Sequence, residues 1–231
     1  MKTVLYYIGL TQLLILQVIL FRTKKYYENQ EDLGYRIPDR AIIISNHRTF
    51  MDGIVIALAF FFRRIHFVAA DFYGDNRRWL KGIIRLAGGI FVGGRESWSQ
   101  LVVESRDALS KRSPILMFPE GEYQHSREPA RFHTGYLRLA IELGAHIVPV
   151  ANDFNYGLGR RVHLMIGNSI DLSEYLGRDL SIDDYRRINE LIRNQFIDLL
   201  HKLKNQKNDD KVAGGRKRRL GDKPRNRTLD K

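Results

Sequence analysis

Residues 41–52 read Ala-Ile-Ile-Ile-Ser-Asn-His-Arg-Thr-Phe-Met-Asp, and this stretch says most about the fold. Its first five residues form a short apolar run with three consecutive isoleucines, which is typical of a strand buried on both faces of a sheet. Residues 49–62 are rich in Ile, Leu, Ala and Phe and predict a helix. A buried strand that leads directly into a helix is the repeating unit of parallel α/β sheets.

The same alternation continues on the C-terminal side of this unit. Further strands are predicted at residues 66–70, 90–92, 114–118, 146–150 and 161–166, and helices at residues 79–86, 96–111, 135–143 and from Ser181 onward. Ser181 and Asp184 form the capping-box pattern that opens a helix. We therefore predict an α/β fold with a central, largely parallel sheet flanked by helices, occupying residues 26–204.

The first 25 residues predict a membrane-anchoring helix. Residues 4–21 are an uncharged, mainly apolar run, and a helix of that length rises about 27 Å, close to the thickness of a bilayer's hydrocarbon core. Lys2 precedes the run, whereas Arg22, Lys24 and Lys25 follow it, so the positive-inside rule places the rest of the chain in the cytoplasm. Three polar residues within the run leave a second arrangement open, a helix lying in one leaflet.

The C-terminal segment, residues 205–231, is polar and basic and is predicted to be disordered. The chain has a net charge of +12, and residues 202–231 contribute +8 of it through twelve Lys/Arg and four Asp. Residues 214–219, Gly-Gly-Arg-Lys-Arg-Arg, suggest an electrostatic tether to anionic lipid. The alternative is a solvated tail that serves only solubility.

His47 and Asp52 are the candidate catalytic pair. Histidine is the natural general base near neutral pH, and a carboxylate bound to its other ring nitrogen fixes the tautomer and stabilises the charged ring. On a regular helix, residues five apart point about 140° away from each other. The two side chains can therefore meet only if His47 lies in the turn before the helix. The alternatives are a capping-box role for Asp52 with Thr49, and a loop histidine without a function.

Two further clusters lie beside predicted strands. Residues 118–121 read Phe-Pro-Glu-Gly, in which Glu120 offers a carboxylate and Gly121 a backbone N–H that could stabilise an oxyanion. Residues 88–95 read Gly-Gly-Ile-Phe-Val-Gly-Gly-Arg and place Arg95 just beyond a strand, where its guanidinium suits a phosphate oxygen. The alternative for residues 118–121 is an ordinary Pro/Gly turn. The alternative for residues 88–95 is a strand with flexible ends followed by a surface arginine.

The composition and the motifs that are missing disfavour several kinds of chemistry. The chain contains no cysteine, which excludes a cysteine nucleophile, a thiolate zinc site and a disulfide scaffold. It has no Gly-x-Ser-x-Gly elbow, and its histidines other than His47 lack the spacing of metal ligands. We therefore expect neither a metal nor a bound cofactor.

Taken in order and with their spacings, these clusters resemble the glycerolipid acyltransferase family that includes bacterial 1-acylglycerol-3-phosphate acyltransferase. The family's first block, N-H-x-x-x-x-D, is matched by Asn46, His47 and Asp52, and its third block, F-P-E-G, by residues 118–121. Its second block, G-x-I-F-V followed by Arg, is matched at residues 88–92 with Arg95, and its fourth, an apolar stretch around V-P, at Val148-Pro149. The resemblance covers about residues 41–170.

The resemblance implies direct transfer of a fatty acyl group from an acyl thioester to a hydroxyl of a lysophospholipid in the membrane. The expected acceptor is 1-acylglycerol 3-phosphate, which gives phosphatidic acid, and the expected donor is acyl-coenzyme A or acyl-[acyl carrier protein]. His47 would remove the hydroxyl proton, Asp52 would orient His47, and the N–H of Gly121 or a nearby amide would hold the oxyanion. Glu120 and Arg95 would shape the acceptor site.

The chain departs from the family pattern at positions that the family associates with the acceptor's phosphate. Glu122-Tyr123 replaces Thr-Arg, Phe132-His133 replaces Phe-Lys, and Gly93-Gly94 replaces Asp-Arg, with Arg127 and Arg131 as candidate substitutes. Other acceptors therefore stay open, namely glycerol 3-phosphate, another lysolipid or a lipid-linked amine. A membrane-anchored nucleic-acid-binding protein is the alternative from another class, but no nucleic-acid-binding motif is recognisable, so we expect no specific nucleic acid partner.

Overall fold

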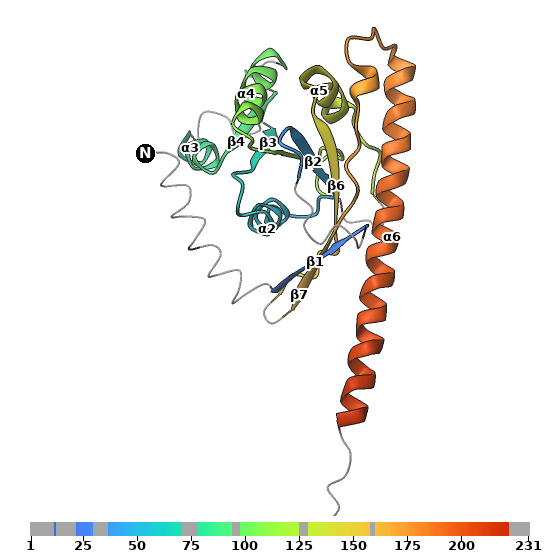
Figure 1. Cartoon of the computed structure of the whole chain (residues 1–231). Coiled ribbons are helices and arrows are strands. Elements are labelled where there is room, and N and C mark those ends of the chain that lie inside the picture. The colour runs from blue at the N-terminus through green and yellow to red at the C-terminus, as the bar shows by residue number, and fades with distance from the viewer. Residues whose placement is uncertain are drawn as a thin grey trace, which may run out of the picture.

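The computed structural model describes residues 12, 22–29, 37–70, 78–93, 98–124, 129–157 and 160–221. These residues form a seven-stranded sheet in the order β1-β7-β6-β2-β5-β3-β4 (Figure 1). The strands are β1 Arg22–Tyr27, β2 Ala41–Ser45, β3 His66–Ala70, β4 Gly89–Val92, β5 Ile115–Met117, β6 His146–Asn152 and β7 Arg161–Ile166. The six strands predicted from the sequence are all present, and the one that was missed is β1.

Neighbouring strands run parallel except for β6 and β7, so the largely parallel sheet is confirmed. The central strand β2 pairs with β5 on one side and β6 on the other, with Ile43 opposite both Leu116 and Val148. Every residue of β2 is fully buried. This agrees with the uninterrupted apolar run, because a parallel strand in the middle of a sheet meets packed side chains on both faces.

Helices cover both faces of the sheet. They are α2 Met51–Ala59, α3 Arg78–Leu86, α4 Trp98–Ser110, α5 Gly135–Leu143 and α6 Ile182–Gly221. Side chains of β2 alternate between two apolar cores, with Ile42 and Ile44 in the core that α4, α5 and α6 cover and Ile43 in the core that contains α2. The period-two alternation of a strand thus places consecutive isoleucines on opposite faces of one sheet.

The N-terminal part of the sheet corrects one predicted boundary. Residues 22–25 were assigned to the end of a membrane-anchoring helix at residues 1–25, but Arg22–Tyr27 is an edge strand that pairs in parallel with β7. The predicted apolar helix itself, residues 4–21, lies outside the described residues apart from Gln12. Of the helices that the structure does describe, none combines the length and the apolar character that a membrane crossing requires.

The C-terminal helix corrects a second boundary. Its capping box is confirmed, because the Ser181 N–H donates to Asp184 Oδ2 at 3.1 Å and the Asp184 N–H donates to Ser181 Oγ at 3.2 Å. The prediction of disorder from residue 205 onward was wrong up to Gly221, where α6 ends. Residues 222–231 of the predicted basic tail lie outside the described residues.

Polar contacts explain why α6 continues past residue 204. Just before this point Lys202 Nζ donates to Glu28 Oε1 at 2.6 Å, and beyond it Lys207 Nζ donates to Asp153 Oδ2 at 2.5 Å. Asp210 accepts hydrogen bonds from Lys24 and Tyr26 of β1. Figure 1 shows this part of α6 running alongside β1 and β7. Tertiary contacts therefore stabilise a helical segment that has little apolar character of its own.

Asp153 is the anchor whose charge state can be tested. Burial alone would raise the pKa of its carboxyl, but hydrogen bonds from the His163 N–H, Lys207 and the Asn155 N–H lower this pKa below the usual 3.8. A carboxyl whose pKa falls on folding stabilises the native state above its unfolded-state pKa, and this contribution disappears as the pH falls through the folded-state pKa.

Asp153→Asn is therefore expected to lower the free energy of unfolding by about 1–3 kcal/mol at neutral pH, because Lys207 loses its anionic partner. The difference from the native protein should shrink once the pH falls below 3.8. Urea unfolding at neutral and acidic pH measures both quantities, with Asp198→Asn as the control, since Asp198 is exposed on the same helix. A loss that stays constant or grows in acid would contradict this account.

Candidate active site

The shared direction of the parallel strands brings three loops to one edge of the sheet. His47 follows β2, Glu120 follows β5, and residues 152–156 lie at and beyond the end of β6. Ile44 pairs with Met117 and Ser45 with Val150, so the three strands end at nearly the same level. Ligand sites of open α/β sheets lie at this carboxyl edge. The structure therefore joins the first and third sequence clusters in one place.

The predicted contact between His47 and Asp52 is present. Helix α2 begins at Met51, so His47 lies in the preceding turn, as the spacing required. His47 Nδ1 lies 3.1 Å from Asp52 Oδ2. The Asp52 side chain is fully buried, whereas 15% of the His47 side chain is exposed. Because an ionised carboxylate can only accept, this contact places the proton on Nδ1 and leaves Nε2 as the basic nitrogen.

Asp52 also caps the turn before α2, in addition to its contact with His47. Its Oδ2 accepts the Arg48 N–H at 2.6 Å and the Thr49 N–H at 2.7 Å. The reciprocal half of the capping box is not formed, since the buried Thr49 Oγ1 has no hydrogen-bond partner within the described part of the chain. The two amides hold the carboxylate in place while it contacts the imidazole.

Aromatic side chains fix the plane of the His47 ring. The ring stacks on Phe118, with centroids 3.7 Å apart and planes inclined by 12°, and lies 4.5 Å from the Tyr123 ring at 48°. Among the described residues, no hydrogen-bond partner occupies His47 Nε2. Stacking and the Asp52 contact together restrict the ring to one orientation, with one nitrogen left for a ligand.

Glu120 organises the loops around His47. One carboxylate oxygen accepts the His47 N–H at 3.0 Å, and the other accepts the Ala130 N–H at 2.9 Å. The residue is buried, and burial raises the pKa of its carboxyl even though both amides act in the opposite direction. The carbonyl of His47 accepts the Gln124 N–H at 2.8 Å, so both backbone groups of His47 are bound. Glu120 thus connects the segment after β2 to the segment before α5.

Gly121 lies in a turn, as the Phe-Pro-Glu-Gly sequence indicated, but its N–H already donates a hydrogen bond within that turn. Its φ is +74°, a left-handed conformation that favours glycine, and its N–H donates to the Phe118 carbonyl at 3.0 Å. A side chain at this position would also meet the His133 ring, whose Cδ2 would lie 3.0 Å from a Cβ atom. The expectation that the Gly121 N–H is available for an oxyanion therefore does not fit this conformation.

The remaining candidate residues are arginines. Arg95, together with the alternative Arg127, falls outside the described residues. Arg131 is described and exposed. Across the described part of the chain, His, Asp and Glu side chains form no group of three or more that could hold a metal ion.

Sequence reasoning missed a buried polar chain behind the His47–Asp52 pair. Asn46 Nδ2 donates to the Asn152 carbonyl at 2.9 Å, and the Asn152 N–H donates to Asn46 Oδ1 at 2.9 Å. The hydroxyl of Tyr156 donates to Asp52 Oδ1. Asn46 belonged to the first block, but nothing in the sequence marked Asn152 and Tyr156 as partners of this block, since they lie more than 100 residues away.

The fold and this geometry define a class: α/β proteins in which an imidazole–carboxylate pair stands at the carboxyl edge of a mainly parallel sheet. Comparison with known proteins narrows the class to one family. The model of the family described as Acyltransferase matches residues 25–153, which is more than half of the chain. The chain therefore belongs to the acyltransferase family.

Two individual proteins are similar to this chain, one in sequence and one in fold. A 1-acyl-sn-glycerol-3-phosphate acyltransferase of Chlamydomonas reinhardtii is 27% identical over 118 residues, which are 49% of this chain and 34% of that protein. The match thus spans about a third of the length of this curated relative. The crystal structure of the 1-acyl-sn-glycerophosphate (LPA) acyltransferase PlsC from Thermotoga maritima superimposes with a TM-score of 0.56 and 20% identity, covering 83% of this chain and 79% of the other. At this identity the likeness shows a shared fold.

Glu120→Ala is expected to lower the free energy of unfolding by about 1–3 kcal/mol for each amide it leaves without an acceptor, those of His47 and Ala130. Thermal or urea unfolding measures the loss. Glu122→Ala is the matched control, because Glu122 is an exposed glutamate of the same turn, and exposed substitutions usually change stability by less than about 0.5 kcal/mol. Equal stability of the two variants would refute the structural role of Glu120.

Proposed function

We propose that the chain transfers a fatty acyl group from an acyl thioester to the free hydroxyl of 1-acylglycerol 3-phosphate, giving phosphatidic acid. The observation that carries this proposal is the contact between His47 Nδ1 and Asp52 Oδ2 at 3.1 Å, in a chain that belongs to the acyltransferase family. The activity for which the Chlamydomonas reinhardtii relative is named supports the choice of acceptor.

In the proposed reaction, His47 acts as the general base. Its Nε2 takes the proton from the acceptor hydroxyl while that oxygen attacks the carbonyl carbon of the thioester. Asp52 holds the ring in the required tautomer and stabilises the imidazolium that forms. When the carbon–sulfur bond breaks, the imidazolium returns the proton to the leaving thiolate. The products are an ester and a free thiol, and the enzyme is restored without a covalent intermediate.

The oxyanion that develops on the thioester carbonyl needs a hydrogen-bond donor. Because the N–H groups of Gly121 and Gln124 donate to the carbonyls of Phe118 and His47, we assign this role to the Glu122 amide in the turn between them. Arg95 is proposed to pair with the acceptor's phosphate, as guanidinium groups commonly do. Glu120 contributes indirectly, through the two loops that it connects.

The donor is proposed to be an acyl thioester of coenzyme A or of acyl carrier protein. A thioester carbonyl is already activated toward an alcohol, so the proposed chemistry needs acid–base and electrostatic help but no bound cofactor or metal. The donor is a co-substrate that leaves as a free thiol in each cycle.

His47→Ala is expected to reduce acyl transfer by about 10²–10⁴-fold, the usual contribution of a general base. Product formation by purified protein is measured by mass spectrometry with an acyl thioester and lysolipid. His201→Ala is the matched control, because His201 is exposed on α6, and its activity should stay near that of the native chain. Turnover by a folded His47→Ala protein at the native rate would end this proposal.

A panel of acceptors tests the substrate separately from the chemistry. We expect 1-acylglycerol 3-phosphate to be acylated faster than glycerol 3-phosphate, other lysolipids or lipid amines when one thioester is used for all. A preference for any of these others would change the acceptor and leave the roles of His47 and Asp52 intact. If the protein acylates none of them but still binds nucleic acid after removal of its basic segment, a membrane-anchored nucleic-acid-binding protein is favoured instead.

The protein is proposed to act at the cytoplasmic face of a membrane. Residues 4–21 would anchor it, and since β1 begins at Arg22, the β1 edge of the sheet would follow the membrane surface directly. The basic residues 216–219 would add attraction to anionic lipid headgroups, worth about 1 kcal/mol for each residue near the surface.

Replacement of Arg216, Lys217, Arg218 and Arg219 by glutamine is expected to weaken binding to vesicles of anionic lipid by up to about three orders of magnitude at low salt. Vesicle co-sedimentation at several salt concentrations measures the effect. Substitution is a cleaner test than truncation after residue 205, which would also remove Lys207 and Asp210 from their contacts with Asp153 and β1. Unchanged, salt-dependent binding by the substituted chain would refute the tether.

A further inference from the structure

The hydroxyl of Tyr156 has a fixed direction. Asn152 Oδ1 accepts the Phe154 N–H at 2.9 Å, so the amide group of Asn152 must turn its Nδ2 toward Tyr156, which it reaches at 2.7 Å. The phenol oxygen thus receives a hydrogen bond from Asn152 and must give its own proton to Asp52 Oδ1. Burial is the largest of several influences that raise the pKa of Tyr156, so the phenol keeps this proton.

We propose that Tyr156 is a positioning residue for the His47–Asp52 pair, and that Lys207 on α6 holds the loop that presents it. This inference rests on the proposed function. Tyr156 acts through Asp52: it binds Oδ1, whereas His47 binds Oδ2. A carboxylate held at both oxygens cannot rotate about its terminal bond, so the oxygen facing the imidazole stays in line with Nδ1.

The loop that carries Tyr156 is held by its own side chains. Phe154 has a φ of +53°, a left-handed conformation that is costly for a residue with a Cβ atom. The Asn152 side chain compensates by accepting the Phe154 N–H, and Asp153 Oδ1 accepts the Asn155 N–H at 3.1 Å. Asn155 Nδ2 donates to the Arg161 carbonyl at 2.9 Å, which connects the loop to β7. The centre of the Phe154 ring also lies 4.8 Å from the guanidinium carbon of Arg48, in the turn before α2.

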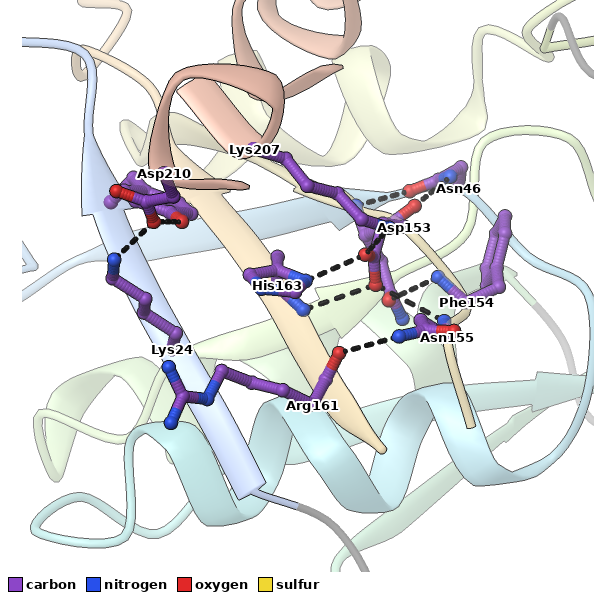
Figure 2. Close-up of polar contacts among 11 residues, drawn as sticks. Lys24, Asn46, Asp153, Phe154, Asn155, Arg161, His163, Lys207 and Asp210 are labelled. Atoms are coloured by element: carbon purple, nitrogen blue, oxygen red, sulfur yellow. Dashed lines mark hydrogen bonds and ion pairs between the residues drawn. The ribbon is translucent and has the colours of Figure 1, made fainter. Parts of the chain in front are cut away.

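Asp153 extends the same loop to α6, as Figure 2 shows. Its Oδ2 lies 2.8 Å from His163 Nδ1 and 2.5 Å from Lys207 Nζ, and its Oδ1 accepts the His163 N–H at 3.0 Å. The side chains of Asp153 and His163 are nearly buried, at 10% and 12% exposure. One turn of α6 is therefore bound to the loop whose next residues place Tyr156 against Asp52. Asp210 fixes the same turn to Lys24 and Tyr26 of β1.

These contacts form one continuous path from α6 to the imidazole. It runs from Lys207 to Asp153, along the loop to Tyr156, and on to Asp52 and His47. Each step is a hydrogen bond or a short stretch of backbone held by hydrogen bonds, and each of the polar side chains along it is partly or fully buried. Loosening the α6 end should therefore change the environment of His47 without removing any group that touches it.

The test compares Tyr156→Phe and Lys207→Met with a matched control, Lys204→Met. Lys204 is an exposed lysine of the same helix, three residues before Lys207. The first readout is the NMR titration of the His47 imidazole in the full-length chain, identified as the signal missing from His47→Asn. The second is kcat and KM for acyl transfer as a function of pH.

In Tyr156→Phe, the His47 titration is expected to move to higher pH. With one donor removed, the Asp52 carboxylate presents more of its negative charge to the imidazolium, which becomes harder to deprotonate. The acid limb of the kcat profile should move the same way, and kcat should fall by about 10- to 100-fold, by analogy with the loss of groups that orient metal-binding histidines. KM should change by less than about twofold, because the affected interaction serves the transition state.

Lys207→Met should move the His47 titration in the same direction by a smaller amount, and Lys204→Met should leave it in place. An unshifted titration in folded Tyr156→Phe would overturn the positioning role, even if kcat falls. An unshifted titration in Lys207→Met would overturn the link to α6, and this partly exposed position keeps the proposal testable if Tyr156→Phe unfolds. Since the NMR readout needs no turnover, a native chain that acylates no lysolipid would defeat the proposed function alone.

Discussion

The carboxylate of Asp52 is the constraint on which the site depends. It is fully buried, and a charge removed from water is tolerated only when hydrogen-bond donors replace the lost solvent. Its two oxygens contact the amides of Arg48 and Thr49, the ring of His47 and the hydroxyl of Tyr156. These donors come from the turn before α2 and from the loop after β6. The burial of one charge therefore forces two distant segments into a single arrangement.

That arrangement also fixes the backbone around His47. The residue donates its N–H to Glu120 and accepts a hydrogen bond from Gln124, so the turn after β5 holds it from both sides. Stacking on Phe118 then limits the ring itself. A general base, the role proposed for His47, must be positioned to within a fraction of an ångström, and these hydrogen bonds and the ring packing restrict His47 in this way. The same turn supplies the amides from which the proposed oxyanion donor is drawn.

Much of the fold was predictable because its strands are buried on both faces. An unbroken apolar run such as 41–45 is compatible with few local structures besides a buried strand, and six strands were located from such runs or from their glycine borders. The missed strand, Arg22–Tyr27, is a polar edge strand whose partner β7 is more than 130 residues away. The extension of α6 past residue 204 was missed for a similar reason, since salt bridges of Lys207 with Asp153 and of Asp210 with Lys24, rather than an apolar stripe, hold it against the sheet.

The sequence by itself predicted that His47 and Asp52 meet, since a separation of five residues allows contact only across a strand-to-helix turn. It also indicated the family, because short blocks of residues at fixed local spacings resemble the family's pattern, and the family model matches residues 25–153. Only the tertiary structure decided that Glu120 braces loops and that Tyr156 binds Asp52 across 104 residues of sequence. The spacing of residues along the sequence limits which neighbouring side chains can meet. Which distant residue binds a buried polar atom depends instead on how the whole chain packs.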